Sequence, residues 1–413
     1  TPLLIGAPAT PISGERRVMA KPRAIELFAG VGGFRLGAEK WWDVVWSNQW
    51  EPSTKAQHAS DCYVRHFGGE GHTCEPIEEV LRKVHAGEAE IPDHDLLMAG
   101  FPCQDYSVAR TLNQATGLEG KKGVLWWYIH EVIHLKRPRF ILLENVDRLL
   151  KSPTTQRGRD FAVMLYSLVT SGYRVEWRVI NAADYGFPQR RRRVFIVGER
   201  GSDVFSPYVL GQAFPSKGES TLDSFPLSGP LEDISGVFGA GLKTTPFRNS
   251  GILSGTVVYT KDVEPDYDGD RVTLGDILQP QEEVSRDFFI PDMQLDKWEY
   301  LKGAKKVPRK HQGSDTHYYY QEGAIAYPDR LDMPSRTILT GEGGSGPSRF
   351  KHLIRTPDGR SRRLTPIELE RLNGFSGDWT EGDTDSRRAF LMGNSLVVGV
   401  VAEIARVLAE KGE

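Results

Sequence analysis

The sequence predicts an α/β protein with a mostly parallel sheet, covered by helices on both faces, and a second, smaller domain of irregular structure. Up to about residue 200, short apolar runs alternate with amphipathic stretches, which is typical of strands joined by helices. Residues 201–335 are instead rich in Gly, Pro, Ser and Asp and hold few periodic segments. With 413 residues, the chain is also too long for one ordinary core, so two domains are expected.

Each predicted strand is a short apolar run, and most of the predicted helices lie between the strands. In such sheets ligands bind at the carboxyl ends of the strands. A glycine turn, the loop that holds Cys103, and Glu144 each follow a predicted strand, so one cleft can contain all three. The strands are expected at 24–29, 43–47, 95–100, 140–145, 173–180 and 193–199, and helical spacing predicts helices at 124–135 and 158–172.

A helical pattern returns in the last part of the chain. Thr365 is a predicted N-cap, with Pro366 at the first helical position and Glu368 placed to complete a capping box. The final helix, 395–412, is apolar over a broad face and should be buried. Residues 1–20 lack the charged start and apolar core of a signal peptide and are expected to form a flexible arm.

The composition restricts the class of protein. The chain is 39% hydrophobic and 26% charged, and no apolar run reaches the roughly 18 residues of a membrane span. Its three cysteines, Cys62, Cys74 and Cys103, lack CxxC spacing, which argues against a disulfide framework or a Cys-rich zinc site and for a reduced, intracellular setting. Because the net charge is −3, any surface for nucleic acid must be a local patch such as 189–194 or 360–364.

Cys103 lies in the stretch "AGFPCQDYSVA", directly after a predicted buried strand. A buried cysteine is usually inert, but the polar neighbours here make a poor core sequence. A nucleophilic thiolate would need partners that lower its pKa, such as a helix N-terminus or an arginine. From this stretch alone, both an inert thiol and a nucleophile stay open.

Four further motifs each have a structural and a functional interpretation. "LFAGVGG" is a tight strand–helix turn or a loop that approaches a ligand, and Trp50 in "SNQWE" is a core residue or stacks on a base. Glu144 in "LLENV" is a capping or ion-pairing residue or an acid. "QRRRRVFIVG" is a solvated basic loop or binds phosphates and bases, with Gln189, Arg191 and Arg193 on one face.

Six segments occur in order across nearly the whole chain: "ELFAGVGGFRLG", "AGFPCQDYS", "LENV", "PQRRRRVFIVG", "RRLTPIELERLNGF" and "MGNSLVVGVV". In this combination the chain resembles the cytosine-C5 DNA methyltransferase family of the prokaryotic, S-adenosylmethionine-dependent type. The resemblance implies a Rossmann-like catalytic domain and a smaller, irregular target-recognition domain. The expected divisions are an arm at 1–20, a first catalytic part at 21–200, target recognition at 201–345, a hinge and return segment at 346–384, and a C-terminal helix at 385–413 that completes the catalytic domain.

The resemblance also assigns roles to residues. Cys103 would attack C6 of a flipped cytosine, Glu144 would hold N3 and the amino group, and Arg193 would pair with O2, while Arg191 braces the loop or a phosphate. No metal is expected. The residues expected to bind S-adenosylmethionine, whose product is S-adenosylhomocysteine, are Phe28, Gly30, Val31, Gly32, Gln49, Trp50, Pro102 and Asn394.

DNA contacts are expected at two places. Gln104, Ser107 and Gln189 lie in or near the predicted site. The stretch 305–320 mixes bases and aromatics, as DNA-binding surfaces do, although a solvated loop is the competing interpretation. Its candidates are Lys305, Lys306, Arg309 and Lys310.

Three positions depart from the family pattern. Gln49 stands where the family usually has a Glu that holds both ribose hydroxyls, so cofactor affinity should differ or Glu51 should take part. Pro76, beside Glu75, stands where an Asp usually contacts the adenine amino group. Lys122 stands where the family often has Arg.

The expected function is DNA (cytosine-5-)-methyltransferase activity on a specific duplex sequence, in restriction–modification or phage defence. The alternatives are a tRNA cytosine-C5 methyltransferase and a non-catalytic DNA-binding subunit. We expect double-stranded DNA as the partner, with any cutting by a separate restriction nuclease or other defence-system proteins. The protein should be a monomer, without a membrane contact, in the prokaryotic cytoplasm.

Overall fold

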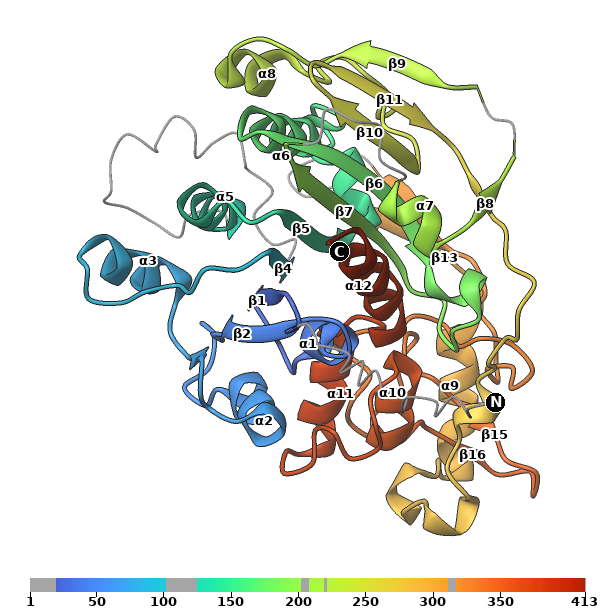
Figure 1. Cartoon of the computed structure of the whole chain (residues 1–413). Helices are drawn as coiled ribbons and strands as arrows, with labels where there is room; N and C mark the ends of the chain where they lie inside the picture. The colour runs from blue at the N-terminus through green and yellow to red at the C-terminus, as the bar shows by residue number, and fades with distance from the viewer. Residues whose placement is uncertain (1–19, 102–124, 202–207, 219–220, 311–316, 413) are drawn as a thin grey trace, which may run out of the picture.

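The computed structural model describes residues 20–101, 125–201, 208–218, 221–310 and 317–412, and its centre is a ten-stranded sheet (Figure 1). The first five strands of the spatial order pair in parallel, and the remaining pairs are antiparallel. All six predicted strands are present, so the predicted α/β class is confirmed. The order is β3 (His72–Thr73), β2 (Asp43–Asn48), β1 (Arg23–Leu27), β4 (Leu96–Gly100), β5 (Phe140–Val146), β7 (Arg192–Arg200), β6 (Tyr173–Asn181), β10 (Ser250–Ser254), β11 (Val257–Lys261) and β9 (Asp223–Pro226).

Helices cover both faces of this sheet, and alternate strand residues enter two different cores. Leu97 points to one face and Met98 to the other, and both are fully buried. The Leu97 face is covered by α3 (Ile77–His85), α5 (Leu125–Lys136), α6 (Arg159–Thr170) and α8 (Leu231–Val237). The Met98 face is covered by α1 (Gly33–Ala38), α7 (Val209–Ala213) and α12 (Val398–Gly412).

The C-terminal helix α12 lies against α1, although the two are far apart in sequence (Figure 1). Trp42 Nε1 donates to Ala405 O at 2.8 Å, and a Cβ on Gly37 would lie 2.9 Å from Val398 O, so the helices are in close contact. By length and composition alone, the segment Asp385–Gly412 could cross a membrane. However, 61% of the apolar 18-residue window within it is buried inside the protein. Its apolar side chains therefore serve as core.

A third core joins the return segment to the N-terminal part of the chain. Residues of α10 (Pro366–Asn373) and α11 (Asp385–Asn394) pack with Val31 and with α2 (His58–Phe67). The predicted capping box is confirmed, because Thr365 Oγ1 accepts from Glu368 N and Glu368 Oε2 accepts from Thr365 N. The buried Arg362 guanidinium also pairs with Glu368, at 2.7 Å.

The sheet does not stop at the expected domain boundary of residue 201. Strands β9, β10 and β11 come from 223–261, inside the range assigned to target recognition, yet β10 pairs with β6 and extends the central sheet. The irregular part begins after these strands. It holds α9 (Asp292–Lys302), β13 (Lys305–Lys310), β14 (His317–Glu322), β15 (Ile354–Arg355) and β16 (Ser361–Arg362), while β8 (Ser216–Lys217) pairs with β12 (Glu264–Pro265).

Short 3-10 helices connect several of these elements, at Asp147–Lys151, Ala182–Tyr185, Gly275–Ile277, Gln281–Glu283 and Arg286–Phe288.

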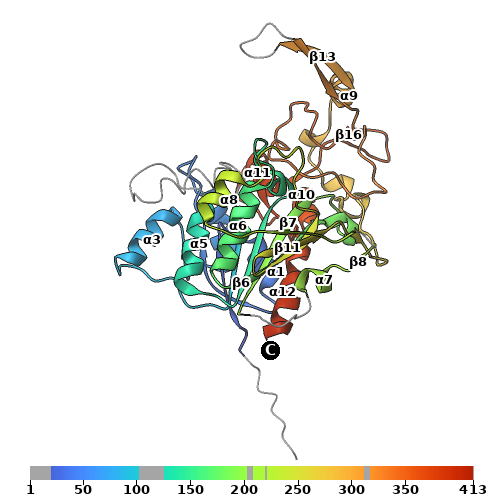
Figure 2. The same cartoon turned by 90° about the horizontal axis from the view of Figure 1, so that it is seen from above.

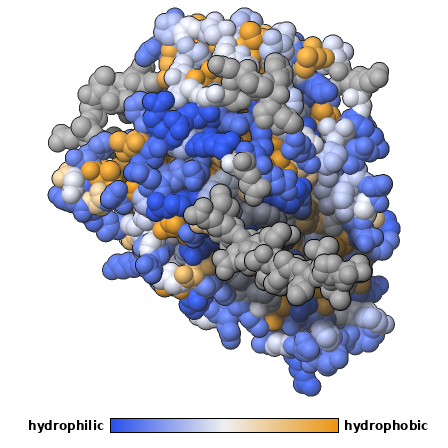
Figure 3. Space-filling model, viewed as in Figure 1, coloured by the Kyte–Doolittle hydropathy of each residue, from blue (hydrophilic) through white to orange (hydrophobic). Residues whose placement is uncertain are grey.

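Figure 2 shows that the β13–β14 hairpin projects well beyond the body of the molecule, on the side opposite the C-terminus. On the face seen in Figure 3, hydrophobic residues form small separate patches in a largely hydrophilic surface. The main cores thus lie around the sheet and under α10 and α11.

Candidate active site

The glycine turn after β1 has a backbone that only particular residues adopt easily. Phe28 has φ of 55°, a strained value for a non-glycine residue, and Gly30 and Gly32 have φ of 57° and 89°. A Cβ on Gly32 would lie 2.3 Å from the Phe67 ring, whereas a Cβ on Gly30 would meet no atom within 4 Å. Gly32 is therefore required by packing, and the space beside Gly30 is open to a ligand.

Gln49, at the end of β2, supports this loop directly. Its Oε1 accepts the Gly30 N–H at 2.7 Å, and the side chain is 8% exposed. The neighbouring Trp50 is 38% exposed, so its ring is available for stacking. Glu51 accepts the Ala59 N–H at 2.9 Å, so this carboxylate binds the first turn of α2.

Val31 can contribute only its backbone to a ligand site. Its side chain is buried in the third core, and its carbonyl accepts from Trp379 Nε1 at 2.9 Å. Trp379 also stacks on His66, with ring centroids 3.6 Å apart. Sequence reasoning missed Trp379, which holds the glycine loop from the return segment.

A buried carboxyl group lies in the strand that leads into the same loop. Glu26 in β1 is fully buried, and this burial raises its pKa to about 8, while the nearby Arg35 guanidinium lowers it in part. Arg35 Nη1 donates to Tyr63 Oη at 3.2 Å and so connects α1 to α2. These groups lie inside the fold, close to the start of the loop.

Glu144 and Arg193 come together across neighbouring strands. Residue 146 of β5 is paired with residue 193 of β7, and Arg193 Nε lies 2.8 Å from Glu144 Oε1. The two side chains are only 13% and 18% exposed. Arg193 Nη1 also donates to Arg192 O at 2.7 Å, which fixes its orientation. The sequence-predicted acid and arginine therefore form one pair at the lip of the sheet.

The same lip is where the chain leaves β4 toward the loop predicted to hold Cys103. Gly100 is the register partner of Glu144, and a Cβ on Gly100 would lie 3.4 Å from Glu144 Oε2. Asn145, which is 2% exposed, donates from Nδ2 to Phe101 O at 3.0 Å and holds the start of that loop. Sequence reasoning did not single out Asn145, although it lies inside the "LENV" motif. Pro102, Cys103, Gln104, Ser107 and Lys122 lie outside the described residues.

Arg191 is a buried residue that joins β7 to two distant segments, as expected for the bracing role predicted for it. The residue is 3% exposed, and its guanidinium donates to Ile338 O at 3.2 Å and to Gly393 O at 2.9 Å. Burial and, to a smaller extent, the neighbouring Arg193 lower its pKa to about 9, although Glu144 acts in the opposite direction. Of the two roles expected, bracing the loop fits this geometry and binding a phosphate does not.

Gln189 is fully buried, and this position corrects its assignment to DNA contact. Its Nε2 donates to Leu372 O and to Asn373 Oδ1, and its Oε1 accepts from Ile338 N at 3.0 Å. The backbone of Gln189 also forms an isolated parallel β-bridge with Ser335, in which Arg190 N donates to Ser335 O at 2.8 Å. Gln189 thus fastens the entry of β7 to the segment around residue 338.

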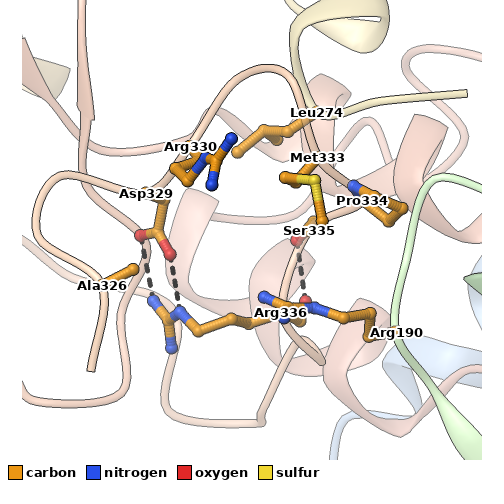
Figure 4. Close-up of a pocket in the computed structure, with 9 residues that line it drawn as sticks. All are labelled: Arg190, Leu274, Ala326, Asp329, Arg330, Met333, Pro334, Ser335 and Arg336. Atoms are coloured by element: carbon orange, nitrogen blue, oxygen red, sulfur yellow. Dashed lines mark hydrogen bonds and ion pairs between the residues drawn. The ribbon is translucent and has the colours of Figure 1, made fainter. Parts of the chain in front are cut away.

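A cavity of about 170 Å³ lies at this seam (Figure 4). Arg336 lines it and pairs with Asp329 at 2.6 Å, while Arg190 enters from the β7 side. Met333 and Leu274 supply apolar wall. None of the residues expected to bind cofactor or the reacting base lines this cavity, so it is separate from the candidate active site.

Asn394 is exposed at the end of α11. The preceding Gly393 allows α11 to approach another segment, because a Cβ there would lie 2.5 Å from Thr340 N. The four basic candidates, Lys305, Lys306, Arg309 and Lys310, all lie on β13. They are far from Glu144 in sequence and belong to the projecting hairpin.

Metal ligands and reactive thiols are sparse in the part of the chain that the structure describes. No group of three or more His, Cys, Asp and Glu residues suited to a metal ion is present among those residues. Cys62 is buried, and burial raises the pKa of its thiol to about 12, while Cys74 is half-buried. The raised pKa of Cys62 argues against a nucleophilic role for that thiol.

The arrangement brings together an open glycine loop, an exposed tryptophan and a carboxylate–arginine pair at the carboxyl ends of β1, β2 and β5. Together these groups can hold a nucleotide-like ligand beside a polar planar group. They lie where α/β sheets bind their ligands.

Comparison with known proteins gives consistent results. The sequence profile described as C-5 cytosine-specific DNA methylase matches residues 22–410. The chain is 45% identical to the Type II methyltransferase M.Sau3AI of Staphylococcus aureus, over 94% of this chain and 95% of that protein. It is 29% identical to the Type II methyltransferase M1.ScrFI of Lactococcus lactis subsp. cremoris, over 96% and 80% of the two chains. The crystal structure of S. pombe Dnmt2 methyltransferase shares the fold, with a TM-score of 0.60 at 17% identity over 95% of this chain and 99% of that one.

Proposed function

Because the chain belongs to the C-5 cytosine-specific DNA methylase family, we propose that its candidate active site transfers a methyl group to C5 of a cytosine flipped out of a specific duplex sequence. The observation that carries the proposal is the Glu144–Arg193 pair, 2.8 Å apart, beside the strand end that leads to Cys103. One carboxylate and one guanidinium match the polar edge of a cytosine.

The residues of the glycine loop fit S-adenosylmethionine. The open space at Gly30, the positive φ of Phe28 and the exposed Trp50 ring form a cradle that a Cβ at Gly30 would enter. Gln49 would orient the loop and face the ribose, Gly32 would keep the turn tight, and Asn394 would close the site from α11. Pro102 is proposed to complete this site from the Cys103 loop. When bound, this cofactor supplies the methyl group as an activated sulfonium.

Catalysis is proposed to begin with the Cys103 thiolate. It adds to C6 of the cytosine, an S–C6 bond forms, and the ring electrons move to C5, which becomes nucleophilic. Glu144 would hold N3 and the amino group and stabilise the charge that develops there, while Arg193 would pair with O2. After C5 has been methylated, its proton passes to solvent and the S–C6 bond breaks. The products are 5-methylcytosine, S-adenosylhomocysteine as the group that has lost the methyl, and free Cys103.

A base inside a duplex cannot reach Glu144 and Arg193, which are largely buried side chains at the sheet edge. The cytosine must therefore be extruded, with unstacking as the energetic cost. Gln104 and Ser107 are proposed to contact the DNA at the flipped position. Target recognition is proposed for the irregular region after β11, including Lys306 and Lys310 of β13.

The biological role proposed is modification of host DNA in a restriction–modification or phage-defence system, with cleavage by a separate nuclease. Two relatives named as Type II methyltransferases, which match over 94% and 96% of this chain, support this role. The protein is proposed to work in the cytoplasm, as a monomer.

The test is methyl transfer by the purified full chain. Wild-type protein should transfer tritiated methyl from S-adenosylmethionine to duplex DNA, and Cys103→Ser should abolish transfer while leaving cofactor binding intact. Transfer to tRNA and not to DNA would contradict the substrate. Unchanged transfer by Cys103→Ser would contradict the mechanism.

A further inference from the structure

The β13–β14 hairpin has two faces of different chemistry. Residues directly opposite each other in an antiparallel pair lie on the same face, and the faces alternate along each strand. Lys306 opposes Gln321, and Lys305 opposes Glu322. The Gln321 face consists of Lys306, Pro308, Lys310, His317, Tyr319 and Gln321, and the Glu322 face includes Lys305, Val307, Arg309, Tyr320 and Glu322.

Much of the Glu322 face makes contacts within the protein, although Val307 on this face is 42% exposed. Arg309 lies over the Tyr320 ring at 3.7 Å, and Tyr320 Oη donates to Glu322 at 2.5 Å. Arg349 pairs with Glu322 at 3.6 Å and also donates to Leu301 O at 3.1 Å. This face therefore fixes the hairpin to the end of α9.

The Gln321 face is exposed at every one of its six positions. It carries two lysines, a histidine, an amide and an aromatic ring, and it has no carboxylate. Tyr319 is 63% exposed, and Lys306 Nζ lies 4.8 Å from the centre of its ring. This face is thus complementary in charge to a polyanion and rich in groups that bind base edges.

The hairpin also has the right shape and position for duplex DNA. It projects from the body of the molecule on the side opposite the C-terminus (Figure 2). A two-stranded ribbon fits the major groove. At about 3.3 Å per residue, Lys306 to Lys310 spans about 13 Å, or about four base-pair steps of about 3.4 Å.

We infer that the Gln321 face enters the major groove and reads the bases around the target cytosine, with Gln321 and Lys306 as specificity-determining residues. This inference rests on the proposed function. The Gln321 amide matches the N6 and N7 groups of adenine, and the Lys306 ammonium matches the acceptors of guanine. The Glu322 face, including Lys305 and Arg309, anchors the hairpin and does not read bases.

The experiment uses the full chain and a randomised duplex library. Wild-type protein, Lys306→Ala, Gln321→Ala, Gln321→Glu and the matched control Lys305→Ala are incubated with S-adenosylmethionine and the library. Bisulfite sequencing then gives the context of every protected cytosine. Circular dichroism and S-adenosylmethionine binding verify that each variant is folded.

We expect one context for wild-type protein and the same context for Lys305→Ala. Gln321→Ala should relax the choice at an A·T pair, and Lys306→Ala at a G·C pair, each by about tenfold or more. Gln321→Glu should shift the same position toward cytosine, whose amino group a carboxylate accepts.

Two outcomes would overturn the inference. One is an unchanged context for Gln321→Ala, Gln321→Glu and Lys306→Ala with an equal loss on every sequence, which indicates phosphate contact only. The other is no change of any kind. Failure of wild-type protein to methylate any duplex cytosine would instead contradict the proposed function.

Discussion

The sheet edge that holds Glu144 and the hairpin that holds Gln321 are built in opposite ways. At the sheet edge, each proposed working side chain lies close to one end of a strand, and its surroundings are completed by distant segments. Arg191, for example, joins β7 to residues 338 and 393. On the hairpin, the proposed working side chains stand on an exposed two-stranded ribbon, fixed at its base through Arg349.

Because of this difference, we expect the methyl-transfer reaction and the choice of DNA sequence to depend on different regions of the protein. A buried pair at the sheet edge is strongly coupled to its surroundings, so a change there should affect rate and stability. An exposed position on the hairpin can change at little cost in stability, and its effect should fall on binding and discrimination. Variants at the sheet edge therefore test whether the two regions are independent.

Glu144→Gln should have the largest effect. Loss of the carboxylate removes the group proposed to hold N3 and the amino group, so the rate of methyl transfer should fall by about 10²–10⁴-fold. The amide can still accept from Arg193, so the fold should stay intact. Single-turnover transfer to a duplex measures the rate.

The matched control is Asp147→Asn, because Asp147 pairs with the exposed Arg192 close to the same strand end. Its rate should stay near that of wild-type protein, since exposed ion pairs contribute little. An altered methylation context in Glu144→Gln would show that the two regions are not independent.

Arg191→Met should have an intermediate effect. Without the guanidinium, the carbonyls of Ile338 and Gly393 lose their donor, so the free energy of unfolding should fall by about 2 kcal/mol. Arg193 lies two residues further along the chain, so the loss of Arg191 should disturb the position of Arg193. We therefore expect kcat to fall, while KM for DNA and the methylated context stay unchanged. Urea unfolding and steady-state kinetics give the three values.

Arg190→Met removes the same charge from an exposed neighbour and serves as control. We expect its stability to match that of wild-type protein. If Arg191→Met leaves both stability and kcat unchanged, the brace has no role in positioning Arg193.

Gln49→Glu should have the smallest effect. A carboxylate at this position can accept the Gly30 N–H and form a stronger, charge-assisted hydrogen bond to a ribose hydroxyl. KM for S-adenosylmethionine should fall by about tenfold or less, with no change in kcat or context. Gln49→Ala, which loses the 2.7 Å bond to Gly30, should raise the same KM. Equal KM values for S-adenosylmethionine in wild-type protein and both variants would contradict a role of Gln49 in cofactor binding.

Much of this arrangement could be predicted from the sequence, because buried parallel strands have a strong apolar pattern and their ends mark the site. The Glu144–Arg193 pair joins two residues that were predicted separately. Alternation placed Gln189, Arg191 and Arg193 on one face, but it could not show that the segment around residue 338 packs on that face and buries the first two. Burial by a distant segment leaves no local signal.

The same reason explains the other differences. Strands β9, β10 and β11 are four or five residues long and lie in a Gly- and Ser-rich region, so nothing local indicated that they extend the central sheet. Trp379 and Asn145 act through single hydrogen bonds to backbone carbonyls, at 2.9 and 3.0 Å. Such contacts depend on the tertiary fold and not on spacing along the chain.

The packing of α12 on α1 has a consequence for how the protein is made. Trp42 and Gly37 are synthesised early, but their partners Ala405 and Val398 leave the ribosome more than 350 residues later. At about 5–20 residues per second, this face of the sheet stays uncovered for roughly 20–70 s. During that time its apolar side chains are available to chaperones and to other nascent chains. Changes that delay or weaken α12 should therefore lower the yield of soluble protein in cells before they affect the rate of the folded enzyme.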